Sequence, residues 1–78
     1  MNGEAMLRVA NVGDEAAMES VRDALDGLDI AYEHVRSEPD DYRFPQTAYF
    51  YVPDHSAEDV EQALADVAQE HGFDAEVL

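Results

Sequence analysis

Residues 47–52 read Thr47-Ala48-Tyr49-Phe50-Tyr51-Val52 and give the strongest strand signal in the chain. Aromatic and β-branched residues dominate this stretch, and such residues suit the pleated, half-buried surface of a sheet. Side chains alternate between the two faces of a strand, so Tyr49 and Tyr51 share one face and Phe50 points to the other. Pro53 is expected to end the strand, because proline cannot donate to the ladder.

Working outward, three further segments read as strands. In Met6–Val12, Leu7 and Val9 alternate toward one face, and Phe73–Leu78 alternates apolar with acidic residues until its last position. A second strand is predicted over Ile30–Arg36. The stretch 37–45, with two prolines and paired aspartates, reads as a loop.

An amphipathic helix is predicted after the first strand. Asp14 suits its N-cap, because a carboxylate can accept hydrogen bonds from the free backbone N–H groups. Gly27 is placed to end it in a left-handed conformation. One helical face carries the apolar residues Ala17, Val21, Ala24, Leu25 and Leu28.

A second amphipathic helix is predicted after residue 53. Ser56 is expected to cap it, with Asp59 forming an imperfect capping box. Gly72 is expected to end it. Its apolar stripe consists of Val60, Ala63, Leu64 and Val67.

The predicted order is therefore β-α-β-β-α-β within 78 residues. Short strand-to-helix loops suit two right-handed crossovers, which predicts an α+β, ferredoxin-like split βαβ sandwich. This fold has a four-stranded antiparallel sheet with both helices on one face. We expect residues 1–5 to be a flexible N-terminus and 6–78 to form a single domain. The strand residues expected to face the helices are Leu7, Val9, Ala48, Phe50, Val52, Phe73, Ala75 and Val77.

The charge of the chain is extreme for its size. Nineteen Asp and Glu residues oppose four basic residues, all arginine, which gives a net charge of −15 with no lysine. Like charges at i+3 and i+4 on a helix repel one another, and concentrated salt screens that repulsion. The composition indicates a halophilic, haloarchaeal type of protein; the alternative is an acidic protein of ordinary habitat with a solvated charged face. The first helix alone carries the stripe Glu15, Glu19, Asp23 and Asp26.

Composition also excludes several classes of protein. The chain has no cysteine, so disulfides and Cys-based zinc sites are excluded. No apolar run approaches the ~20 residues of a membrane span, and no membrane association is expected. Met1–Ala5 lacks the basic and apolar regions of a signal peptide, and we expect a cytoplasmic protein.

Three candidate contact sites emerge. Arg8, Tyr49 and Tyr51 should lie on the sheet face that the helices leave open. There they could stack on a flat ligand or pack on a second subunit, or the tyrosines could simply be good strand formers.

The other two candidates lie in connections. Asn11, Gly13 and Asp14 form the first strand-to-helix turn, where backbone N–H groups could hold an anion, although Asp14 would itself fill that position. The triplet Tyr42-Arg43-Phe44 could contact a partner or tuck over the sheet edge.

No catalytic or metal-binding pattern is visible. The histidines show no metal-ligand spacing, the serines have no nucleophile-elbow context, and Asp40-Asp41 lacks an apolar wall that would raise a pKa. We therefore predict a non-enzymatic protein without metal or cofactor. The residues considered are His34, His55, His71, Ser20, Ser37 and Ser56.

The chain resembles a small ACT-type domain. It shares the β-α-β-β-α-β order, a glycine in the first turn (Gly13) and a final helix-Gly-strand segment over Val60–Leu78. The resemblance implies an amino acid or similar metabolite bound near that turn, commonly at a dimer interface, which points to Asn11, Gly13 and Asp14. The family's Pro-Gly-Leu turn is missing here.

The chain also resembles an RNA recognition motif. Leu7–Val12 is similar to that family's first-strand signature, with Arg8 in place of a stacking aromatic, and 48–52 is similar to the third-strand signature. Phe50 stands where a smaller residue is usual, and the acidic chain offers few cations for phosphates. Binding of nucleic acid is therefore not expected.

The sequence predicts a non-enzymatic regulatory module that binds a ligand or a protein. Its expected partners are a small molecule, another protein or a second copy of itself. The alternative is an RNA-binding module that uses the open sheet face.

Overall fold

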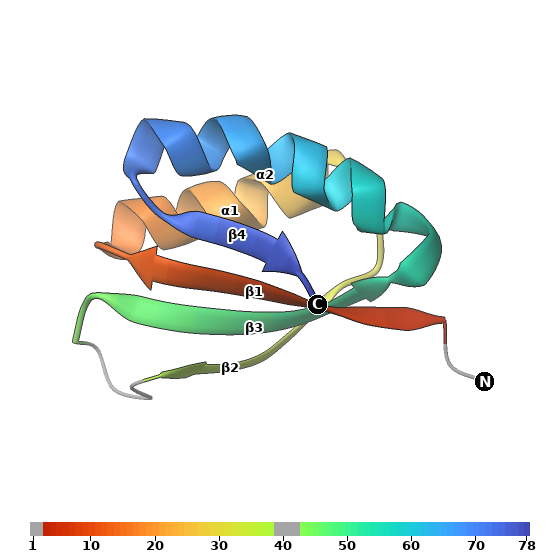
Figure 1. Cartoon of the computed structure of the whole chain (residues 1–78), viewed down its shortest axis with the longest axis horizontal. Coiled ribbons are helices and arrows are strands. Elements are labelled where there is room, and N and C mark those ends of the chain that lie inside the picture. The colour runs from red at the N-terminus through yellow and green to blue at the C-terminus, as the bar shows by residue number, and fades with distance from the viewer. Residues whose placement is uncertain (1–2, 39–42) are drawn as a thin grey trace.

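The structure, a computed structural model, describes residues 3–38 and 43–78 and has the predicted ferredoxin-like architecture (Figure 1). Its elements follow the order β-α-β-β-α-β, with one short 3₁₀ turn, η1, before the second helix. They are β1 (Glu4–Val12), α1 (Glu15–Gly27), β2 (Glu33–Glu38), β3 (Gln46–Pro53), η1 (Asp54–Ser56), α2 (Ala57–His71) and β4 (Asp74–Val77).

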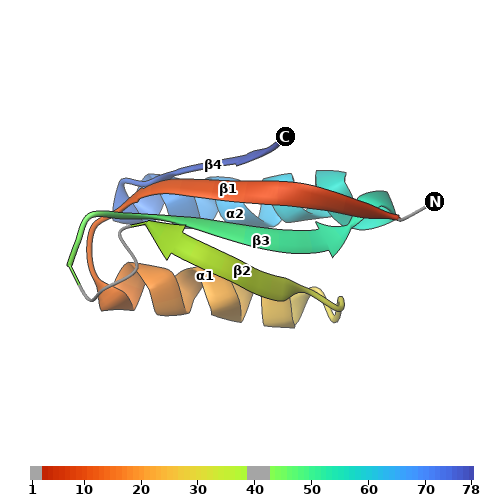
Figure 2. The ribbon, with the colours of Figure 1, turned by 90° about the horizontal axis from the view of Figure 1, so that it is seen from below.

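The four strands form one antiparallel sheet in the order β2-β3-β1-β4. Figure 2 looks onto this sheet with both helices behind it. The molecule thus has two layers, and one sheet face carries no helix. We call this uncovered surface the open face.

The core lies between the sheet and the helices. Phe50 and Leu7 of the central strands are fully buried against Leu25 of α1 and Leu64 of α2. The predicted inward alternation is confirmed for β1 and β3. Ala75 and Val77 of β4 are partly buried and pack against the same cluster.

The first strand differs from its predicted form at both ends. It begins at Glu4, two residues before the expected Met6, and Glu4 pairs with Pro53 in the last position of β3. Near its other end the register shifts between Val9 and Val12. Asn11 lies in this bulge with a positive φ of 63°, a conformation that asparagine tolerates better than most residues.

The helix ends were predicted only in part. Asp14 caps α1 as expected, because its Oδ1 accepts from the Ala17 backbone N–H at 2.9 Å. Gly72 ends α2 with φ 77°. The helix α1 ends at Gly27 as predicted, but the left-handed conformation expected of this glycine was wrong: the left-handed residue is Asp29, with φ 55°.

Ser56 precedes α2 but makes no side-chain capping hydrogen bond. The 3₁₀ turn Asp54–Ser56 leads directly into the helix and gives Ser56 a φ of −104° and ψ of 4°, away from the extended conformation of a typical N-cap. The expected cap was therefore right in position and wrong in mechanism.

The second strand starts later than predicted, at Glu33 instead of Ile30. Ile30 and Tyr32 are apolar because they pack against the core from the α1–β2 connection, not because they belong to the ladder. The strand itself carries mostly polar residues, since it lies at the edge of the sheet.

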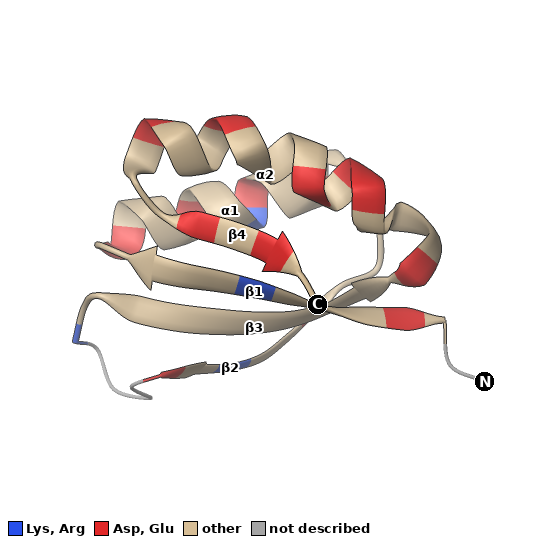
Figure 3. Cartoon of the chain, viewed as in Figure 1, with Lys and Arg blue, Asp and Glu red and all other residues tan. Residues whose placement is uncertain are grey.

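The acidic residues of segments 3–38 and 43–78 are exposed. Figure 3 shows them spread over both helices and β4, with few basic positions among them. The predicted α1 stripe from Glu15 to Asp26 is exposed along its whole length. In the part of the chain that the structure describes, no helix has both the length and the apolar character needed to cross a membrane.

Candidate functional site

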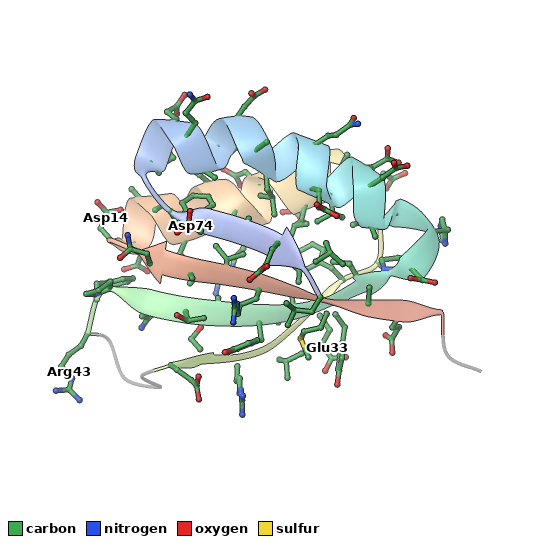
Figure 4. The ribbon with its side chains drawn as sticks, viewed as in Figure 1. Asp14, Glu33, Arg43 and Asp74 are labelled. Atoms are coloured by element: carbon green, nitrogen blue, oxygen red, sulfur yellow. The ribbon has the colours of Figure 1, made fainter. Side chains whose placement is uncertain are left out.

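Three connections meet at one end of the sheet. They are the β1–α1 turn, the segment that enters β3, and the α2–β4 turn at Gly72 (Figure 1). Figure 4 places Asp14 and Asp74 at this end and shows Arg43 projecting away from it. The first turn and residues 43 and 44 of the predicted triplet therefore lie at the same end of the molecule. Tyr42 of that triplet lies outside the described residues.

Asn11 connects two of these turns. Its left-handed backbone directs the side chain toward the α2–β4 turn, where Nδ2 donates to the carbonyl oxygen of Gly72 at 3.3 Å. The contact joins residues 61 positions apart. Asn11 itself is exposed.

A shallow hollow of about 180 Å³ lies beside Asn11, and Pro45, Gln46 and Thr47 complete its lining. We call this site the Asn11 hollow. Its lining offers amide and hydroxyl groups and no charged side chain. Asn11 could be identified from the sequence, but Pro45 and the two β3 residues could not, because only the β1–β3 pairing brings them beside Asn11.

The remaining residues of the first turn have a structural role. The Asp14 carboxylate occupies the N-terminus of α1, so an anion would meet a negative charge there. Gly13 is exposed, with open space beside it. The turn therefore contributes to the hollow through Asn11, and not through an anion site at the helix.

The described part of the 42–44 triplet is divided between the surface and the core. Phe44 is partly buried and packs against the core cluster. Arg43 is exposed. A cis peptide bond joins Phe44 to Pro45, which lines the hollow.

The open face carries one residue from each strand in a single row. Arg36 of β2 lies opposite Tyr49 of β3, Tyr49 opposite Arg8 of β1, and Arg8 opposite Glu76 of β4. We call these four residues the central row. Arg8 forms a salt bridge with Glu76, and the Arg36 guanidinium carbon lies 4.8 Å from the Tyr49 ring centroid. Sequence analysis found Arg8 and Tyr49 but missed their neighbours, which only the strand register identifies.

Tyr51 belongs to the next row of the open face. It lies opposite Met6 on β1 and Glu33 on β2, and its exposed fraction is 36%. The Arg36 guanidinium covers the Tyr49 ring, which leaves Tyr51 as the more accessible of the two aromatic platforms. Stacking of successive bases on both rings would require Arg36 to move away.

A polar cluster connects β2 to α1 on the helix side of the sheet. His34 stacks on Phe50 with a centroid distance of 4.7 Å, Arg22 lies 3.4 Å from its Nδ1, and Ser37 lies 2.9 Å from its Nε2. Burial and the Arg22 guanidinium lower the pKa of His34. The neutral ring can accept from Arg22 and donate to Ser37.

A second His-Ser contact joins the two helices. Ser20 Oγ of α1 lies 3.1 Å from His71 Nε2 of α2, and Glu70 Oε1 lies 3.5 Å from the same nitrogen. A nucleophilic triad needs the acid on the opposite ring nitrogen, where it can orient the base. These three residues therefore lack the arrangement of a charge-stabilised nucleophile.

Within residues 3–38 and 43–78, no group of three or more His, Cys, Asp or Glu side chains could hold a metal ion. The sites with favourable geometry are therefore the uncharged Asn11 hollow and the open face with its central row.

Solved structures with this fold include two regulatory subunits of aspartate kinase. The chain aligns with the ligand-free subunit from Thermus thermophilus at a TM-score of 0.79, with 25% identity over 96% of its length. The Thermus flavus subunit gives 0.74, with 23% identity over 99%. A DUF3240 family protein from Shewanella baltica gives 0.56, with 17% identity over 100% of this chain and 90% of that protein.

The chain spans about half of each Thermus subunit, 50% and 52% of their lengths. No protein-family profile matches it, and no curated protein matches it in sequence. The likeness supports the ACT-like, ferredoxin-like fold, and both Thermus neighbours are regulatory subunits.

Proposed function

We propose that this chain is a non-catalytic regulatory module that binds a small polar metabolite in the Asn11 hollow and contacts a partner subunit through its open face. The observation that carries the proposal is the hollow itself, in a fold that matches half of two regulatory subunits.

The lining of the hollow favours a neutral or zwitterionic ligand. Asn11 and Thr47 supply hydrogen-bonding groups without charge, and the surrounding chain is strongly acidic. A free anion would be repelled, whereas an amino acid brings its own compensating charge. A volume of about 180 Å³ is below the ~300 Å³ of sites for drug-sized ligands and suits a molecule of amino-acid size.

Ligand binding there could be transmitted through two neighbouring contacts. Asn11 connects the hollow to the α2–β4 turn through Gly72. Thr47 lies on the same face of β3 as Tyr49 and Tyr51, so the hollow adjoins the open face. A ligand held between these residues would touch both the helix layer and the surface offered to a partner.

We also propose that the protein works in concentrated salt, in a haloarchaeal type of cytoplasm. The support is the absence of lysine, the net charge of −15 and the exposed acidic stripe of α1. At ~1 M salt the Debye length is about 3 Å, so neighbouring carboxylates along a helix no longer repel strongly.

Backbone amide NMR in concentrated KCl tests the ligand proposal. An amino-acid panel is expected to shift Asn11, Gly13 and Thr47, and a short RNA to leave Tyr49 and Tyr51 unchanged. RNA shifts at the two tyrosines with none at the hollow would contradict the proposal and favour an RNA-binding module. The absence of chemical-shift changes at the hollow with every ligand tested would also contradict the proposal.

Asn11→Gly provides the matched variant, because glycine keeps the left-handed backbone and removes only the amide. It should weaken the ligand response while leaving the fold intact. Asp29→Gly is the control, since Asp29 is the other non-glycine residue with positive φ among those described and lies in the α1–β2 connection, away from the hollow. The control variant should respond like the wild type.

A further inference from the structure

The order of chemical groups in the central row makes the row complementary to a second copy of itself that runs in the opposite direction. Across the sheet it presents a cation, an aromatic ring, a cation and an anion, namely Arg36, Tyr49, Arg8 and Glu76. Reversed, the row presents an anion, a cation, a ring and a cation. Each position therefore meets a favourable counterpart when a second copy faces the first.

We propose that two copies of this chain pair through their open faces about a two-fold axis that runs parallel to the strands, between β1 and β3. This inference rests on the proposed function only in that it names the partner of the open face. Such an axis places β2 opposite β4 of the partner and β3 opposite its β1. Arg36 then faces the partner's Glu76, and Tyr49 faces the partner's Arg8, with both contacts repeated by symmetry.

Known packing distances allow these contacts. Sheets stacked face to face lie about 10 Å apart with strand directions within about 30°. Arginine and glutamate side chains from the two sides can meet across that gap. Each Tyr49 would have the Arg36 guanidinium of its own chain and the Arg8 guanidinium of the partner subunit as cation–π neighbours.

The interactions within one chain leave the row incompletely satisfied. Arg36 Nη2 lies 3.9 Å from Glu38 Oε2, and the two side chains are 62% and 57% exposed. Arg8 Nε is buried and has no hydrogen-bond partner among the described residues. The exposed Arg36 guanidinium is free to take a second carboxylate, and the partner's Glu76 would supply it.

The residues on either side of the central row, together with the net charge, predict how salt should affect formation of the dimer. Tyr51 would face the partner's Met6, a favourable sulfur–aromatic contact. Glu38 would face the partner's Asp74, and two bodies of net charge −15 repel at long range. Because salt screens this long-range repulsion more than the buried pairs, the dimer should form more readily at high salt.

The experiment is a charge-exchange pair read by light scattering and sedimentation in concentrated KCl. Arg36→Glu alone and Glu76→Arg alone each place like charges opposite one another twice, and each should weaken self-association on the order of 100-fold. Mixed in equal amounts, the two variants should form a heterodimer, because both contacts then join opposite charges: one is the wild-type Arg36–Glu76 pair and the other is the same pair with its charges exchanged. The mixed pair has the same total charge as the wild-type pair, so a general charge effect cannot explain its recovery.

Glu61→Arg on the exposed face of α2 is the control and should dimerise like the wild type. Amide NMR spectra verify that each variant is folded. A monomeric wild type at millimolar concentration, single variants that dimerise normally, or a mixture that stays monomeric would each overturn the pairing. If the dimer does not form but amino acids still shift the Asn11 hollow, the pairing is wrong and the ligand proposal is supported. If the dimer forms but amino acids do not shift the hollow, the ligand proposal is wrong and the pairing is supported.

Discussion

The side chain of Asn11 donates a hydrogen bond to the carbonyl oxygen of Gly72, and both residues have positive φ, 63° and 77°. The bulge in β1 and the end of α2 are therefore two left-handed turns held together by one amide. This contact couples the rim of the hollow to the helix layer.

Replacing Asn11 with alanine should destabilise the protein more than replacing it with glycine. Alanine in the left-handed region costs about 1–2 kcal/mol, whereas glycine adopts it freely and loses only the exposed hydrogen bond. Urea unfolding in concentrated KCl measures the difference. Equal stability of the two variants would mean that the backbone conformation at Asn11 is not constrained.

Two adjacent residues of β3 should differ sharply in their sensitivity to truncation. Phe50 is fully buried and contacts the rings of His34 and Tyr32, so Phe50→Ala should cost about 3–5 kcal/mol. Tyr51 lies on the open face, and Tyr51→Ala should cost less than about 1 kcal/mol at low protein concentration. Denaturant unfolding checks both, and similar losses would place the core on the wrong side of the sheet.

Much of the fold could be predicted because local and periodic signals agreed. The alternation in β1 and β3 identified the core face, and Asp14 and Gly72 marked helix ends through the chemistry of their own caps. These features depend on residues close in sequence. The order of elements then left few topologies to consider.

The details that escaped prediction depend on contacts between distant segments. The left-handed residue after α1 is Asp29 and not Gly27, since the helix continues through the glycine. The hollow takes its other three lining residues from Pro45 and the first two residues of β3, which only tertiary pairing brings beside Asn11. Arg36 and Glu76 could be assigned to the open face only from the strand register, which the sequence does not give.

The acidic stripe of α1 should make stability depend on salt. Asp23 is exposed and lies four residues from Glu19 and three from Asp26. Asp23→Lys replaces two repulsive neighbours with attractive ones and should stabilise the protein by roughly 0.5–1 kcal/mol in dilute buffer. Thermal unfolding across a KCl series should show the wild-type midpoint rising with salt and the advantage of the variant disappearing near 1 M. A wild-type midpoint independent of KCl would contradict the salt-adapted proposal.

The neutral imidazole of His34 should make the fold sensitive to mild acid. Burial first, and then the Arg22 guanidinium, lower the pKa of His34 below the usual histidine value of about 6.5, so the unfolded chain binds this proton more tightly than the folded one. Its contribution to stability is therefore complete above pH 6.5 and falls as the pH drops from there through the lowered pKa. Protonation would also place a proton on Nδ1, facing Arg22.

Unfolding measurements between pH 5 and 8 should show this loss in the wild type and a flatter profile for His34→Gln, which keeps a polar side chain but does not titrate. An NMR titration of the imidazole assigns the effect to His34 and separates it from His55 and His71. A His34 titration midpoint above 6.5 would contradict the prediction, because the ring would then gain a proton on folding and the protein would become more stable as the pH fell.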